Sequence, residues 1–159
     1  MPPSDQNKTN PGAVAAAGQM EDSAGQFVAK FASHYENCVS LAKRFTVDNP
    51  DLEEDSAAIS QLCRASQEML GQAKEARALT EIYLALGEQH RDAVREIITA
   101  RFKDISKLAR ASWLRFRDSI KLAQTTKREI EAAQQEFEPH ADKFQQALRA
   151  FVAMTTKTH

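Results

Sequence analysis

The chain has 159 residues, of which 27% are charged, with 21 Lys and Arg against 22 Asp and Glu. A formal net charge of −1 argues against nucleic-acid binding, which usually needs a strongly basic domain. No apolar run approaches the roughly 20 residues that span a bilayer, and the N-terminus lacks the pattern of a signal peptide. These features predict a cytoplasmic protein. Few glycines, prolines and aromatic residues, among many good helix formers, predict an all-α fold.

The N-terminal region differs in composition from the rest of the chain. Residues 1–20 are rich in Pro, Ser, Asn, Gln, Gly and Ala and have no periodic apolar face, which predicts a mobile tail. A single helical-bundle domain is then expected over residues 21–156. Its first helix should begin near Asp22 or Ser23, either of which can cap free N–H groups, and should run for roughly 25 residues.

A second helix is predicted to begin at Asn49, as N-cap, and Pro50, at the first helical position. The acidic residues that come next, up to Asp55, would favour the dipole of its first turns. Gly87 leaves two alternatives, a turn between two helices or a position inside one very long helix. We favour the turn, because residues 86–90 have the composition of a short connection.

A third helix is expected from Asp92 to about Glu138, because no breaker interrupts that segment. At 1.5 Å per residue it would be roughly 70 Å long. Pro139 either kinks this helix or begins a short final one. The predicted architecture is therefore an elongated antiparallel helical bundle with coiled-coil character, made of three long helices and, in the second alternative, a short C-terminal fourth.

Five of the eight phenylalanines follow one seven-residue register: Phe102, Phe116, Phe137, Phe144 and Phe151. Side chains seven apart return to nearly the same side of a helix, so these rings should form a ridge. The predicted first helix, about 37 Å long, is too short to cover it. Part of the ridge should therefore be an exposed interface. The side chains expected to contact a partner protein or a second copy are Phe102, Trp113, Phe116, Phe137, Phe144 and Phe151.

A basic flank runs beside this ridge at steps of three, four and seven. Its members are Lys103, Lys107, Arg110, Arg117, Lys121 and Arg128. The simplest interpretation is a solvated surface, partly neutralised by acidic residues of another helix such as Glu68, Glu75 and Glu81. The alternatives are a docking surface for an acidic protein or for anionic lipid. Downstream the charge reverses between Glu129 and Asp142, and such opposite blocks on one long helix could align antiparallel copies in a dimer.

The sequence offers no motif for catalysis, cofactor binding or metal binding. No two histidines are four residues apart, no Glu-x-x-His occurs, and there is no glycine-rich phosphate loop. We therefore expect a non-enzymatic helical interaction module, a scaffold, adaptor or assembly subunit that acts through the phenylalanine ridge. Two alternatives remain: a peripheral binder of anionic membrane surfaces through the basic flank of residues 101–128, and a cytoplasmic chaperone of a secreted or helical partner.

Overall fold

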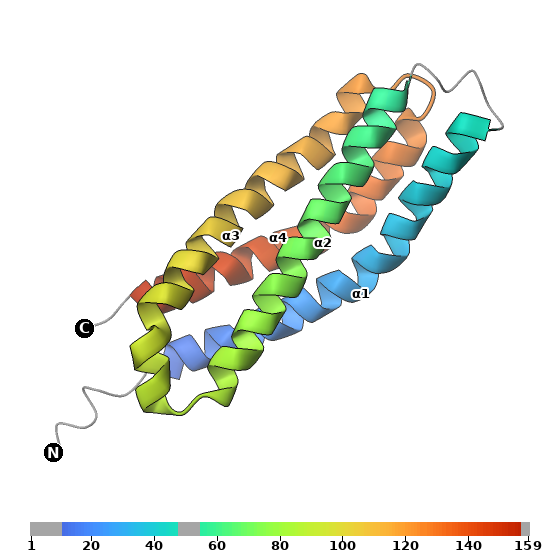
Figure 1. Cartoon of the computed structure of the whole chain (residues 1–159). Helices are drawn as coiled ribbons and strands as arrows, with labels where there is room; N and C mark the ends of the chain where they lie inside the picture. Colours follow the sequence, from blue (N-terminus) through green and yellow to red (C-terminus); the bar gives the residue numbers. More distant parts are fainter. Residues whose placement is uncertain (1–10, 48–54, 157–159) are drawn as a thin grey trace, which may run out of the picture.

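A computed structural model describes residues 11–47 and 55–156, which form an elongated antiparallel bundle (Figure 1). Within these residues the chain forms four helices and no strand: α1 (Pro11–Val47), α2 (Ser56–Ala85), α3 (Glu88–Leu122) and α4 (Lys127–Thr156). Helices α1 and α3 each pack against both α2 and α4. The predicted all-α bundle is confirmed. None of the described helices has a stretch apolar enough and long enough to cross a membrane.

Helix α1 begins at Pro11, well before the predicted start at Asp22. Proline suits a first helical position, because its missing N–H would have no intrahelical acceptor there. Behind it, small apolar side chains recur at three- and four-residue steps and are buried: Ala13, Ala16, Ala17, Met20 and Ala24. The prediction that residues 11–20 belong to a mobile tail is therefore wrong. Alanines with one methionine make a buried face that a search for bulky residues overlooks.

The turn at Gly87 is confirmed, since α2 ends at Ala85 and α3 begins at Glu88. Carbonyls at the end of α2, which lack intrahelical partners, accept hydrogen bonds from Leu86 and Arg91. The N–H of Leu86 donates to the carbonyls of Ile82 and Tyr83, at 3.2 and 3.3 Å. The guanidinium of Arg91 donates to the carbonyls of Tyr83 and Leu84, both at 3.0 Å. The predicted start of the second helix, at Asn49 and Pro50, lies outside the described residues.

The predicted continuous helix over residues 92–138 is wrong, because α3 ends at Leu122 and α4 begins at Lys127. Asp55, which directly precedes α2, holds the intervening loop. Its buried carboxylate accepts hydrogen bonds from the N–H of Gln124 (2.7 Å), the N–H of Thr126 (2.6 Å) and the hydroxyl of Thr126 (2.7 Å). Burial by itself would raise the pKa of Asp55, but these hydrogen bonds outweigh it and hold the pKa below its ordinary value.

Helix α4 is as long as α2, and Pro139 lies inside it. Of the two alternatives at Pro139, the one in which a short final helix begins there is therefore wrong. Proline removes one backbone hydrogen bond from a helix interior. Pro139 and Gln135, four residues earlier, both lie on the exposed side of α4, where water can solvate the released carbonyl.

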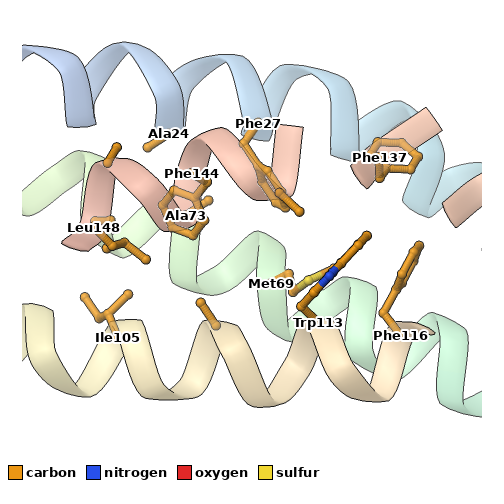
Figure 2. Close-up of a cluster of buried hydrophobic side chains, with 14 of the residues drawn as sticks. Ala24, Phe27, Met69, Ala73, Ile105, Trp113, Phe116, Phe137, Phe144 and Leu148 are labelled. Atoms are coloured by element: carbon orange, nitrogen blue, oxygen red, sulfur yellow. The ribbon is translucent and has the colours of Figure 1, made fainter. Parts of the chain in front are cut away.

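The phenylalanine ridge is the core of the bundle (Figure 2). Because the chain reverses between α3 and α4, the two halves of the ridge face each other instead of continuing in one line. Phe102 of α3 lies 4.6 Å, centroid to centroid, from Phe151 of α4, and Phe116 lies 6.5 Å from Phe137 in an edge-on contact. Phe144 contacts Phe27 of α1 at 5.3 Å.

These contacts bury the residues that were predicted to form an interface. The rings expected to contact a partner are at most 6% exposed, and the folded chain itself covers them: Phe102, Trp113, Phe116, Phe137, Phe144 and Phe151. Trp113 stacks on Phe116 at 5.1 Å and points inward like the others (Figure 2). The expectation of an exposed ridge is wrong, because the chain reverses between α3 and α4 and the two halves of the ridge bury each other in the core of the four-helix bundle.

Candidate functional site: the basic flank of α3

The structure divides the predicted basic flank between two helices. Lys103, Lys107, Arg110, Arg117 and Lys121 are exposed side chains of α3, and we call these five the α3 flank. Arg128 is also exposed but lies in the first turn of α4, beyond the loop, so it does not continue the stripe. From Lys103 to Lys121 the α3 flank extends for about 27 Å along the helix.

The acidic residues expected to neutralise this surface bind other arginines. Glu75 pairs with Arg101, whose guanidinium donates to both carboxylate oxygens. Glu68 accepts a hydrogen bond of 2.6 Å from Arg115, and this pair also joins α2 to α3. Glu81 pairs at 3.2 Å with Arg77 of its own helix.

These pairs mark the side of α3 that faces α2. The hydrogen bond from Arg101 lowers the pKa of Glu75, so this carboxylate is engaged at neutral pH. The interpretation that Glu68, Glu75 and Glu81 neutralise the flank is therefore wrong.

Four cations of the α3 flank make no ion pair within the described part of the chain: Lys103, Lys107, Arg110 and Arg117. Lys121 pairs at 3.3 Å with Asp118, one turn earlier in the same helix. Like charges on successive turns repel one another in the free protein, by a few tenths of a kcal/mol per pair. A ligand of opposite charge would relieve that repulsion.

A single large apolar side chain interrupts the α3 flank. Leu114 is 43% exposed and comes four residues after Arg110 and three before Arg117, so all three lie on one face. Ile97, Leu108 and Leu122 are also exposed on α3, at helical positions outside the row that Arg110, Leu114 and Arg117 form. The surface thus combines fixed positive charge with a small apolar contact point.

The acidic block of the sequence lies on the neighbouring helix. Glu129, Glu131, Glu136, Glu138 and Asp142 are all exposed residues of α4. Helix α4 runs back along α3, and the amide of Gln134 donates to the carbonyls of Phe116 and Arg117, at 3.2 and 2.7 Å. The two charged blocks therefore lie side by side within one molecule. The expectation that they succeed each other along one long helix is wrong.

The groups with shifted pKa values lie at three separate places, and of these groups only Glu75 and Arg101 contact each other. Besides Asp55 and Glu75, burial raises the pKa of Tyr83, and the pairing with Glu75 raises the pKa of Arg101. Within residues 11–47 and 55–156, no three His, Cys, Asp or Glu side chains come close enough together to hold a metal ion. The α3 flank is an exposed, positively charged surface, and the absence of enzymatic activity stays a prediction.

Comparisons with protein-family models, with curated proteins and with solved structures find no match for this chain. The class of protein that the fold defines is the four-helix bundle.

Proposed function

We propose that this protein is a non-enzymatic four-helix interaction module that binds an acidic protein through the α3 flank. The observation that supports the proposal is the row of four exposed cations without ion pairs in the described residues, while the acidic residues of α2 bind other arginines. Complementary charge across an interface speeds encounter and fixes the register between partners. A scaffold, an adaptor or an assembly subunit could each use such a surface.

The form of the surface favours a protein over a membrane. Helices that lie on membranes insert bulky apolar or aromatic side chains next to their basic residues. In α3 the aromatic rings Phe102, Trp113 and Phe116 point into the core, and Leu114 is the large apolar side chain among the flank cations. Protein interfaces commonly pair a small apolar anchor with arginines and a polar rim. We expect a partner helix with Asp or Glu at three- and four-residue steps, which matches the spacing of the flank.

The experiment compares two triple variants of equal net charge. The flank variant replaces three cations of α3: Lys107→Glu, Arg110→Glu and Arg117→Glu. The control variant replaces three exposed cations of α2 and α4: Lys74→Glu, Lys143→Glu and Arg149→Glu. The probe is a fluorescent helical peptide with Glu at every third and fourth position, titrated by anisotropy at low and physiological salt.

The wild-type protein and the control variant should bind this peptide with similar affinity, and the flank variant at least about tenfold more weakly. Binding by the wild type should weaken as salt rises. An equal loss in both variants would show that only net charge matters and would refute the proposal. Flank-dependent flotation with phosphatidylserine vesicles, without binding of the peptide, would establish the membrane alternative instead. A wild type that dimerises through the flank in sedimentation would identify a second copy as the partner.

A further inference from the structure

A cleft lies between the first half of α3 and the last turn of α4, away from the Asp55 contact. Its volume is about 250 Å³, which is ample for a small ion with some water. The walls are made by side chains of two helices: Arg95, Thr99, Ala100 and Lys103 of α3, and Thr155 and Thr156 of α4. Glu96 also lines it.

Two polar atoms in this cleft are buried without a hydrogen-bond partner among the described residues. Thr99 is only 8% exposed, and its hydroxyl oxygen makes no hydrogen bond. The Nε of Arg95, one turn earlier, is likewise buried and unpartnered, and the guanidinium lies 4.0 Å from Asp92. Buried polar groups are nearly always satisfied in folded proteins. Two unsatisfied polar groups on successive turns of one helix, both belonging to residues that line one cleft, therefore point to a ligand.

The unpartnered groups of the cleft indicate the kind of ligand. Arg95, Thr99 and Lys103 are spaced by four residues, so they line up along one side of α3. The two cations are opposed by the carboxylates of Glu96 and Asp92, so the kind of ligand follows from the unpartnered groups: the Nε of Arg95 can only donate a hydrogen bond and therefore needs an acceptor. The hydroxyls of Thr155 and Thr156 donate to the carbonyls of Phe151 and Val152, at 3.0 and 2.6 Å. Their oxygens can therefore accept a hydrogen bond from a ligand hydroxyl.

We propose that this cleft binds a small oxyanion, a phosphate or a carboxylate group, whose oxygens accept hydrogen bonds from Arg95 Nε, the Thr99 hydroxyl and Lys103 Nζ. Guanidinium and hydroxyl donors suit both groups, because each presents two or more oxygens at fixed spacing. The inference is independent of the acidic-protein proposal. Lys103 belongs to both surfaces, but Thr99 and Arg95 are not part of the α3 flank.

The test is a titration of the full-length, ¹⁵N-labelled protein, monitored by the amide signals around Ala100 and Thr155. Sodium phosphate and sodium acetate are used as separate probes, with chloride keeping the ionic strength constant. Thr99→Val removes the hydroxyl at nearly constant shape, and Arg95→Gln removes the guanidinium. Thr99→Ser keeps the hydroxyl, and Arg117→Gln serves as control because it removes a cation outside the cleft.

The wild type should show saturable shifts with at least one probe, and the probe that saturates identifies the group. Thr99→Val and Arg95→Gln should each weaken binding about tenfold or more, whereas Thr99→Ser and Arg117→Gln should stay within about twofold of the wild type. Circular dichroism checks that each variant is helical. The proposal is overturned if neither probe saturates, if Thr99→Val titrates like the wild type, or if Arg117→Gln weakens binding as much as Arg95→Gln.

Discussion

Asp55 offers the sharpest test of the structure, because one buried carboxylate holds the loop between α3 and α4. Asp55→Ala removes three hydrogen bonds of 2.6–2.7 Å and leaves the N–H groups of Gln124 and Thr126 without their acceptor. We expect the loop to detach and the adjoining ends of α3 and α4 to fray.

The loss of stability expected for Asp55→Ala follows from these three hydrogen bonds. A hydrogen bond to a charged group contributes about 1.5–3 kcal/mol net, but bonds to one acceptor are not additive, and the substitution also removes the cost of burying the charge. We therefore expect Asp55→Ala to lower the free energy of unfolding by about 3 kcal/mol. For a chain of this size that corresponds to a fall in Tm of about 6–12 °C.

Asp55→Asn provides the pH test. The pKa of Asp55 in the folded protein lies below the ordinary value of 3.8, so its carboxylate stabilises the fold above that value. This stabilisation is lost as pH falls through the folded pKa, since the protonated group can no longer accept all three bonds. The asparagine does not titrate. The stability gap between the wild type and Asp55→Asn should thus be constant near neutral pH and should narrow below about pH 4.

Urea unfolding monitored by circular dichroism, at about pH 7 and at two points below about pH 4, measures both effects. Thr126→Ser keeps the hydroxyl donor and is the matched control, expected within about 1 kcal/mol of the wild type. A loss below about 0.5 kcal/mol for Asp55→Ala at neutral pH, or a gap for Asp55→Asn that widens in acid, would refute the reasoning.

Three further outcomes can be measured in the same assay. Gly71→Ala should raise the free energy of unfolding by about 0.5–1 kcal/mol, because Gly71 is exposed inside α2 and an added Cβ would meet no atom within 4 Å; an unchanged value would contradict this. Phe137→Ala should cost about 3–5 kcal/mol at any protein concentration, since the ring is buried within one chain; a concentration-dependent loss would instead implicate a partner. Glu75→Gln should cost less than about 1 kcal/mol, and less again in high salt, because the side chains of Arg101 and Glu75 are 43% and 37% exposed.

Composition predicted the helical class and the turn at Gly87, and periodicity selected the rings that form the core. It could not show which surfaces those rings meet. A ridge of rings such as Phe102 and Phe137 has the same spacing whether it packs on a partner or on the other half of itself. Whether the ridge packs on a partner or on its own other half depends on where the chain reverses.

At this reversal the loop is held by a contact between residues 71 positions apart, Asp55 and Thr126. Asp55 follows other acidic residues at the predicted start of a helix, where acidic residues are common. No local pattern therefore distinguishes it from its neighbours. The pair Thr125–Thr126 carried a weak signal, because β-branched polar residues are poor helix formers. The sequence likewise does not show that four cations of the α3 flank lack ion pairs among the described residues. Their lack of ion pairs depends on Glu75 and Glu68 pairing with Arg101 and Arg115 instead.

The cyclic arrangement of the helices has a consequence for chain connectivity. Helix α1 begins and α4 ends at the same end of the bundle as the Leu86–Gly87 turn (Figure 1), and α4 packs directly against α1. A linker joining the two termini, with new ends opened at that turn, would give a circular permutant in the order α3–α4–α1–α2 that keeps every neighbouring pair. The fold therefore specifies which helices are neighbours. Chains that carry these helices in a different order along the sequence could adopt the same fold.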